Sequence, residues 1–462
     1  MKKLESLIPH AVVVLFLILV SAAVLSYILP AGQYERIQVE GRLAVVPGSY
    51  HAVEPSPVGL LDMFRALPRG FRTAVDIIFI VFASGIMFGF LDRSGAIENT
   101  VGTMVRRMGF GRRYLVVIAM TFLYGALGVF TGFESSIPLI PIAALLSLAI
   151  GGDLMLAAGI SIAGVAVGFG LSPINPYTVG TAHKIAHLPL FSGAGLRTVL
   201  CVSALALLAW YNGRYFRKIT GTPDASLSAG LNTKGLSFSR PIEDCRVTGR
   251  DLVVIGVLAA GLAVKLWGVF VHHWHISDIA ALYCLLALAV ALISRHGPNA
   301  TGEIVLQSVA VVAPGAFMVG YASAIKEVLE MGRTSDTIAH YLSSLLDGLP
   351  IYWSALGMTG IQSAMNFLIP SGSGQALATM PVLIPVGEVL GLTRQTTVLA
   401  FQVGDGLTNL VNPALGGLIA MLALCRVPFD RWLRFITPYL VYAFILASGA
   451  VVTSVAIGYG PF

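Results

Sequence analysis

Long apolar runs separated by short polar segments dominate the pattern of this chain. About 20 consecutive apolar residues are enough for a helix to cross the hydrocarbon core of a membrane. Runs of at least about this length lie near 10–30, 74–92, 154–188, 195–212, 251–271, 276–294, 305–325, 395–425 and 432–458. The first of them is expected to be a retained span, because it is long and lacks a small-residue cleavage site. The pattern therefore predicts an all-α polytopic membrane protein with nine crossings.

Two of these runs, 154–188 and 395–425, are longer than one crossing requires, and each contains an Asn-Pro pair. Proline removes a backbone donor and frees upstream carbonyls, so each run is expected to be a discontinuous helix. Upstream of each run lies a polar, Gly- and Pro-broken segment, at 128–138 and at 366–375. Irregular backbone at membrane depth is tolerated only where protein buries it or where it lines a water-filled cavity. We expect each segment to form the tip of a re-entrant helical hairpin.

The two halves of the chain share the order of their motifs. Leu139-Ile-Pro-Ile142 matches Leu383-Ile-Pro-Val386, and Asn175-Pro176 matches Asn412-Pro413. On the nine-crossing map the two copies begin on opposite sides of the membrane, so they are inverted. Inverted repeats with discontinuous helices are typical of secondary transporters.

This interpretation divides the chain into five parts. We expect a first span with an extracytoplasmic loop at 1–73, and a first repeat at 74–212 with its hairpin at 114–150 and its broken helix at 154–188. A cytoplasmic linker follows at 213–250, and a connecting transmembrane pair at 251–294. The second repeat is expected at 305–458, with its hairpin at 351–392 and its broken helix at 395–425.

Composition agrees with a membrane protein, since 56% of the residues are hydrophobic and only 11% are charged. Basic residues gather at the ends of apolar runs, which predicts a cytoplasmic N-terminus and an extracytoplasmic C-terminus in the inner (plasma) membrane. The formal net charge of +6 therefore does not indicate nucleic-acid binding. The four cysteines have no metal-site spacing, and no nucleophile, zinc-protease or phosphate-loop motif is present, so neither an enzyme nor a cofactor is expected.

The second tip, residues 370–375, supplies hydroxyls and backbone amides that glycine leaves uncovered. A helix beginning near Gln375 would present unpaired N–H groups and a positive dipole, which suit a substrate carboxylate. The alternatives are an ordinary Gly-rich loop and, for Asn366, capping of the preceding helix. The candidate substrate-binding residues here are Asn366, Pro370, Ser371, Gly372, Ser373, Gly374 and Gln375.

The first tip, residues 131–136, repeats this pattern and adds an acid. A carboxylate within a bilayer is costly unless it is paired, faces water or is protonated. Glu134 is therefore a candidate ligand for a cationic group or a proton carrier, with helix capping as the alternative. The candidate substrate-binding residues here are Thr131, Gly132, Glu134, Ser135 and Ser136.

The interruptions of the two broken helices carry the remaining candidates. Asp405 lies between Gly404 and Gly406, which loosen the helix, and we expect it to bind substrate or ion together with Thr408 and Asn409. Asn175, Pro176 and Asn412, again with Asp405, are candidates for a coupling-ion site for Na⁺ or H⁺, although a packing kink is the alternative for each Asn-Pro pair. Lys265 is expected to extend its ammonium toward the membrane surface.

Three motifs resemble a known family. Phe367-Leu-Ile-Pro-Ser-Gly-Ser-Gly-Gln-Ala376, Phe401-Gln-Val-Gly-Asp-Gly-Leu-Thr-Asn-Leu-Val-Asn-Pro413 and Val167-Gly-Phe-Gly-Leu-Ser-Pro-Ile-Asn-Pro-Tyr-Thr-Val179 resemble the YfcC family, which is related to the DcuC-type C4-dicarboxylate carriers. The resemblance implies the ion transporter superfamily fold, a scaffold that often forms a homodimer, and a transport domain that moves as an elevator. It implies a substrate that is either a C4-dicarboxylate or a basic amino acid exchanged as arginine for ornithine.

The residues favour a secondary active transporter of a small carboxylate-bearing metabolite, an amino acid such as arginine or ornithine. Acids lie at or near the tips and no Lys or Arg lies in either of them, whereas a dianion would require more positive charge than two helix ends provide. The alternative is a cation-coupled C4-dicarboxylate transporter, in which the acids bind Na⁺ or H⁺. A channel is a further alternative, but a channel does not need two inverted broken-helix units.

Overall fold

The computed structural model describes residues 11–39, 42–46, 48–108, 112–234, 236, 244–272, 274–346 and 348–460. The expected cytoplasmic start of the chain and part of the predicted linker, including 237–243, lie outside these residues. In the first half the helices are α1 (Ala11–Ile28), α2 (Leu60–Thr73), α3 (Val75–Ser94), α4 (Ala96–Met108), α5 (Arg113–Thr131), η2 (Glu134–Leu139), α6 (Ile140–Ala149), α7 (Leu154–Ala158), η3 (Gly159–Ala163), α8 (Gly164–Gly170), η4 (Pro176–Gly180), α9 (Thr181–Ile185), α10 (Ala194–Gly221) and η5 (Pro223–Ala225). In the second half they are α11 (Gly249–His272), α12 (Ile276–Ile293), α13 (Pro298–Met331), α14 (Ser335–Ser344), α15 (Ile351–Leu368), α16 (Gly372–Val389), α17 (Arg394–Thr408), α18 (Gly416–Leu424) and α19 (Phe429–Ala456).

Within the described part of the chain, seven helices are long and apolar enough to cross a membrane. Six of them coincide with predicted spans: Val75–Ser94, Ala194–Gly221, Gly249–Gly268, Ile276–Ile293, Pro298–Met331 and Phe429–Ala456. The seventh, Arg113–Phe130, occupies the first arm of the predicted hairpin at 114–150. The predicted runs at 154–188 and 395–425 are both interrupted, the first between α8 and η4 and the second between α17 and α18.

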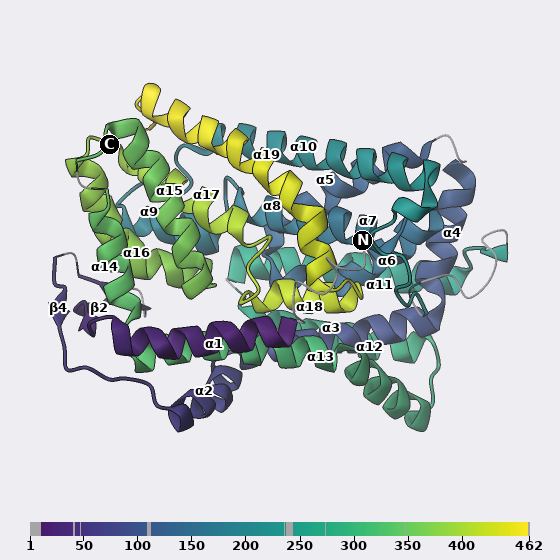
Figure 1. Cartoon of the computed structure of the whole chain (residues 1–462). Helices are drawn as coiled ribbons and strands as arrows, with labels where there is room; N and C mark the ends of the chain where they lie inside the picture. Colours follow the sequence, from purple (N-terminus) through teal and green to yellow (C-terminus); the bar gives the residue numbers. More distant parts are fainter. Residues whose placement is uncertain are drawn as a thin grey trace.

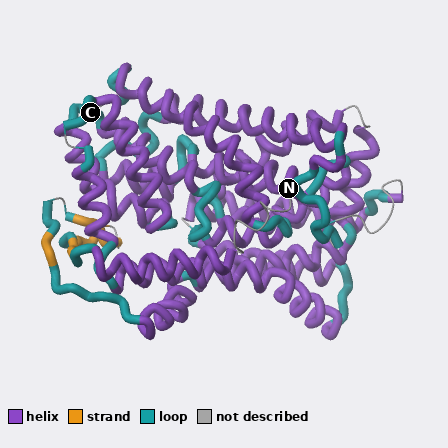
Figure 2. The backbone as a smooth tube through the Cα atoms, in the orientation of Figure 1, coloured by secondary structure: helices purple, strands orange, loops and turns teal. Residues whose placement is uncertain are grey.

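The helices are arranged in layers (Figure 1). The long helices α10 and α19 run along one side, and α1, α3, α12 and α13 run along the opposite side. Helices α5 to α8 and α15 to α18 lie between these layers, where loops interrupt the tube of the backbone (Figure 2). The interrupted segments therefore occupy the middle of the fold, where protein covers their backbone polar groups.

The all-α description is wrong for the loop that follows α1. There β1 (Gly32–Gln33) pairs antiparallel with β4 (His51–Ala52), and β2 (Arg36–Val39) pairs antiparallel with β3 (Arg42–Val45). Arg36 fastens this loop to α14, because its guanidinium donates to both carboxylate oxygens of Asp336, at 2.7 and 2.8 Å. Burial, with a smaller contribution from the nearby Asp336, raises the pKa of Tyr34 to about 12, so its hydroxyl stays protonated at neutral pH.

The two broken helices cross where each has a glycine. A methyl group added to Gly170 of α8 would lie 2.5 Å from Cα of Gly406 of α17, and one added to Gly406 would lie 2.5 Å from Cα of Gly170. Only residues without a side chain permit this approach. The amide of Gln402 donates to the carbonyl of Ser172, at 2.7 Å, and holds the second broken helix against the interruption of the first.

Candidate functional site

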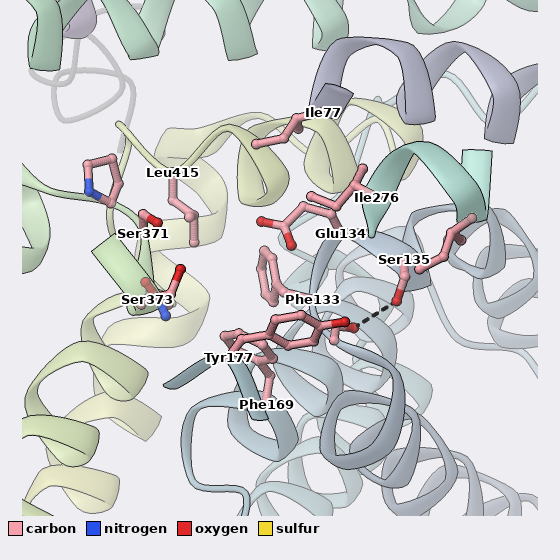
Figure 3. A pocket seen from close by; sticks show the side chains of 15 residues that line it. Ile77, Phe133, Glu134, Ser135, Phe169, Tyr177, Ile276, Ser371, Ser373 and Leu415 are labelled. Atoms are coloured by element: carbon pink, nitrogen blue, oxygen red, sulfur yellow. Dashed lines mark hydrogen bonds between the residues drawn. The ribbon is translucent and has the colours of Figure 1, made fainter. Parts of the chain in front are cut away.

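A cavity of about 190 Å³ lies between the two predicted tips, and we call it the tip cavity. Figure 3 shows Glu134 on one side of it and Ser371 and Ser373 on the other. The long helices close it with Ile77 of α3 and with Ile276 and Ile279 of α12. The remaining lining residues come from the tips and the broken helices: Gly132, Phe133, Ser135, Phe169, Tyr177, Pro370, Gly372, Asn409 and Leu415.

The second tip is shaped by Pro370 and by the hydroxyl of Ser371. Helix α15 ends at Leu368, and α16 begins at Gly372 with Ser371 as its cap, whose hydroxyl accepts from the N–H of Gly374 at 3.3 Å. The helix was predicted to start near Gln375 and begins one turn earlier, because the Ser371 side chain replaces the missing backbone acceptor. The first backbone N–H groups of α16 thus lie beside the tip cavity.

The first tip turns at Gly132, whose φ of +89° favours glycine. The hydroxyls of Ser135 and Ser136 donate to the carbonyl of Gly132, at 3.3 and 3.2 Å. No side chain caps the short helix η2 that follows, and the carboxylate of Glu134 lines the tip cavity instead. The geometry therefore does not show the capping role, and the ligand role of Glu134 stays a prediction.

Lys265 was predicted to extend toward the membrane surface, and this prediction is wrong. Its side chain is 2% exposed, and its ammonium donates to the main-chain carbonyl of Ser135 at 2.8 Å. The hydroxyl of Tyr283 on α12 donates to the same carbonyl. The Lys265 amine also donates to the hydroxyl of Tyr283 at 3.3 Å, so two acceptors in the interior replace the water that it would meet at the membrane surface. The fold therefore brings the amine of Lys265 to the first tip, which contains no Lys or Arg of its own.

Behind the second tip lies a buried polar network centred on Asn366. Its amide nitrogen donates to Thr408 Oγ1 at 2.7 Å, Asn409 Oδ1 at 2.8 Å and the carbonyl of Asp405 at 3.0 Å. Asn366 therefore joins α15 to α17 and does not cap α15. One turn earlier, Gln362 receives hydrogen bonds from Gln375 and Thr379. The sequence signal that was missed is Gln362 four residues before Asn366, because this spacing places both amides on one helix face.

The asparagines of the two Asn-Pro pairs play matching roles. Asn175 Oδ1 accepts from the N–H of Tyr177 at 2.8 Å, and Asn412 Oδ1 accepts from the N–H of Ala414 at 2.9 Å. The amide nitrogen of Asn175 donates across the interruption to the carbonyl of Phe169 at 3.1 Å, whereas that of Asn412 donates to the carbonyl of Asn366 in α15 at 2.7 Å. Both side chains are thus used to stabilise the turns.

The structure brings together about half of the candidate residues. Those that line the tip cavity are Gly132, Glu134, Ser135, Pro370, Ser371, Gly372, Ser373 and Asn409. Asn366, Gln375, Asp405 and Thr408 lie in the buried layer behind it, and Ser136 and Gly374 belong to the tips without lining the cavity. Thr131 ends α5, and its side chain lies outside the described part of the structure. Asn175, Pro176 and Asn412 lie at the helix interruptions. The apolar lining residues, such as Phe133 and Ile276, were missed because nothing in their local sequence distinguishes them from packed core.

Comparisons with known proteins identify the family. The family model described as DcuC, C4-dicarboxylate anaerobic carrier, matches residues 8–456. A proposed basic amino acid antiporter of Escherichia coli K12, YfcC, is 29% identical over 491 residues, which cover 98% of this chain and 97% of the relative. An uncharacterised protein of Haemophilus influenzae is 24% identical over 496 residues, which cover 97% of each chain.

Two solved structures are similar at a TM-score of 0.45. MtrF of Neisseria gonorrhoeae, from a class of antimetabolite efflux pumps, is 16% identical, and the match covers 98% of this chain and 96% of that one. The YdaH transporter of Alcanivorax borkumensis is 17% identical, with 98% and 100% covered. Since the family model spans nearly the whole chain, this multi-pass membrane protein belongs to the DcuC family of C4-dicarboxylate anaerobic carriers and is a transporter, not an enzyme.

Proposed function

We propose that this transporter is a secondary active carrier of a small carboxylate-bearing amino acid, such as arginine or ornithine, and that the tip cavity is its substrate site. The observation that carries this proposal is that one cavity has a carboxylate, Glu134, on one side and the start of helix α16 on the other. An amino acid with a cationic side chain is complementary to this cavity, because its positive end can face Glu134 while its carboxylate faces the start of α16.

The substrate carboxylate is assigned to the second tip. The hydroxyls of Ser371 and Ser373 and the N–H groups at the start of α16 are donors, and the helix dipole adds partial positive charge there. Gly372 leaves its backbone accessible from the cavity, where it lies among the lining residues. These groups recognise a planar anion without needing a Lys or Arg at that tip.

The cationic group of the substrate is assigned to Glu134. A carboxylate in a partly enclosed cavity attracts a guanidinium or ammonium group more strongly than it would in water. The E. coli relative, which is proposed to exchange basic amino acids, agrees with this assignment. Phe133, Phe169 and Tyr177 supply the apolar wall along which the aliphatic part of such a substrate would pack.

Transport by an elevator movement of two inverted repeats is part of the proposal. The tip cavity lies where the long helices α3 and α12 meet the tips, so moving the tips along these helices would carry a bound substrate across the membrane. We assign the N-terminus to the cytoplasm, the C-terminus to the opposite side of the inner membrane, and a homodimer to the scaffold, as the sequence pattern and the family resemblance suggest.

A second candidate substrate is a C4-dicarboxylate coupled to cations. The observation that favours it is Lys265, whose buried amine lies directly behind the first tip and is a basic group that the tip itself lacks. The name of the family agrees with this candidate. In this case Glu134 would bind a coupling cation or a proton.

Uptake into proteoliposomes separates the two candidates. Labelled arginine or labelled succinate is supplied outside, with and without a Na⁺ gradient, and with ornithine or fumarate inside. Arginine uptake driven by internal ornithine is expected. Succinate uptake that requires Na⁺, without arginine uptake, would replace the first candidate by the second. Silence with both substrates would contradict both.

A further inference from the structure

Arg197 is buried near the start of α10, one of the helices that are long and apolar enough to cross a membrane. The residue is 1% exposed, and it forms no ion pair with a carboxylate among the described residues. An arginine guanidinium stays protonated in proteins, and an ionised side chain within a membrane-spanning segment is costly. The presence of Arg197 at this position therefore requires an explanation beyond packing.

The guanidinium of Arg197 donates to three acceptors on two elements. One amino group donates to the carbonyl of Ser192 in the loop before α10, at 2.9 Å. The other donates to Gln395 Oε1 at the start of α17, also at 2.9 Å, and Nε donates to Gln402 Oε1 two turns further along α17, at 3.0 Å. The rigid planar fork of arginine suits such simultaneous contacts. All three acceptors are neutral, so these contacts orient the partners of Arg197 without neutralising its charge.

Gln402 extends this contact to the first broken helix. Its Oε1 faces Arg197, and its amide nitrogen donates to the carbonyl of Ser172 at 2.7 Å. Rotating the amide by half a turn would set its nitrogen against Nε of Arg197 and its oxygen against the Ser172 carbonyl. Arg197 can only donate, so it fixes which way the amide points. Because Gln402 is 1% exposed, losing either contact would leave a buried polar atom unpaired.

Ser172 belongs to an interruption that holds two residues of the tip cavity. It lies between α8 and η4, and its hydroxyl accepts from the N–H of Ile174 at 3.2 Å. Asn175 closes the same interruption, since it accepts from the N–H of Tyr177 and donates to the carbonyl of Phe169. Phe169 and Tyr177 both line the tip cavity, and Figure 3 shows their rings at its wall. The interruption and this part of the wall are thus one hydrogen-bonded unit.

We propose that Arg197 is a positioning residue for the substrate site, because it orients Gln402, which holds the interruption of the first broken helix and the cavity wall attached to it. Arg197 is not among the residues that line the tip cavity, so it acts through these contacts and not by touching the substrate. The inference rests on the proposed function, since it takes the tip cavity as the substrate site. A wall that is already held in place costs less to order when the substrate binds, and this raises affinity.

Two glutamine-to-glutamate substitutions separate the effect of position from the effect of charge. Gln402→Glu and Gln395→Glu each keep the shape of the side chain and set a carboxylate against Arg197. Only Gln402→Glu removes the donor to Ser172, and it places a carboxylate against that carbonyl. In Gln395→Glu the lost donor faces the hydroxyl of Ser192, which can turn and donate to the new carboxylate. Gln395→Glu is therefore the matched control.

Uptake of labelled arginine into proteoliposomes gives the transport measurement. Gln402→Glu is expected to raise the KM by about tenfold and to change the maximal rate less, because the altered contact positions the binding site. Gln395→Glu should keep the KM of the unmodified protein. Equal KM values in the two variants overturn the positioning role. If both values rise, the charge of Arg197 matters and its geometry does not.

Amide hydrogen exchange of the purified full-length protein gives a measurement that needs no substrate. Exchange within residues 169–178 should be faster in Gln402→Glu than in Gln395→Glu, while the thermal unfolding midpoints of the two variants agree. Arg197→Met should show the same faster local exchange, and unchanged exchange there would mean that Gln402 does not need Arg197 to orient it. Faster exchange across the whole chain of Gln402→Glu, with a lower midpoint, would reduce the contact to a stabilising one and overturn the proposal.

The two measurements distinguish failure of this proposal from failure of the proposed function. Arginine uptake with the same KM in both glutamate variants contradicts the role of Arg197 alone. Faster exchange within residues 169–178 of Gln402→Glu, together with silent uptake of both arginine and succinate by the unmodified protein, supports the link from Arg197 and contradicts the proposed substrates.

Discussion

The ammonium of Lys265 donates to the main-chain carbonyl of Ser135 at 2.8 Å, although the two residues are 130 positions apart. Ser135 lines the tip cavity, and Lys265 belongs to the connecting helix α11. Lys265 forms no ion pair with a carboxylate among the described residues. The contact therefore fastens the first tip to α11 and places the Lys265 amine behind the proposed substrate site.

Replacing Lys265 by methionine should separate transport from stability. We expect the apparent KM for arginine to rise by about tenfold or more, because the first tip loses a hydrogen bond that holds it in place. A hydrogen bond to a charged group contributes about 1.5–3 kcal/mol. The thermal unfolding midpoint should stay near that of the unmodified protein, because loss of a buried unpaired charge offsets loss of its hydrogen bond. Uptake kinetics and thermal unfolding in detergent measure the two effects.

Lys265→Arg keeps the charge and is expected to restore part of the affinity. Tyr283→Phe keeps Lys265 but removes the second donor to Ser135 and an acceptor of the Lys265 amine at 3.3 Å, so it tests the hydrogen bonds of this group without changing the charge of Lys265. An unchanged KM in Lys265→Met would show that the contact has no role in substrate binding.

Replacing Glu134 by glutamine should change substrate preference. This substitution keeps the shape and removes the charge that we assign to the cationic end of the substrate. Arginine uptake should fall by at least about tenfold, which corresponds to about 1.4 kcal/mol, through a higher KM. Glu388→Gln is the matched control, because Glu388 is paired with Arg394 away from the tip cavity. Equal arginine KM values in the two variants would remove Glu134 from the substrate site.

The sequence predicted which segments are helical and which segments carry the candidate residues. It did not predict which of these residues line the tip cavity and which lie in the buried network behind it. Apolar run length and the Asn-Pro pairs located the long helices and the two interruptions, because both depend on local chemistry. The roles of Lys265 and Arg197 depend on contacts between distant elements. Lys265 meets Ser135 across 130 residues, and Arg197 meets Gln402 across the two halves of the chain. No local pattern records such pairs.

Breaking the contact between Arg36 and Asp336 should release the loop that follows α1. Asp336 accepts two hydrogen bonds from Arg36 and one from the N–H of Tyr34, at 3.0 Å. Asp336→Asn should therefore destabilise the attachment of the loop more than Arg36→Gln does. Each substitution should lower the free energy that holds the loop in place by on the order of 1 kcal/mol, because the pair is partly exposed. Limited proteolysis within residues 29–59 is the measurement, with faster cleavage expected in both variants.

The double variant tests whether the two residues act through each other. If they do, Arg36→Gln combined with Asp336→Asn should be cleaved no faster than Asp336→Asn alone. Additive effects of the two substitutions would contradict a direct interaction.

Adding a methyl group where the two broken helices cross should destabilise the protein more than the same substitution at a helical glycine with open space around it. Gly170→Ala and Gly406→Ala would each place a methyl carbon 2.5 Å from the opposing Cα, so the helices must separate. Overpacking of this kind costs about 1–3 kcal/mol. Gly213→Ala on α10 is the control, since nothing lies within 4 Å of its added methyl group and alanine favours a helix. Thermal unfolding midpoints should therefore fall for the first two variants and stay level or rise for the third. Equal midpoints in all three would mean that α8 and α17 do not pack as closely as described, and the packing that joins the two halves around the site would then have to lie elsewhere.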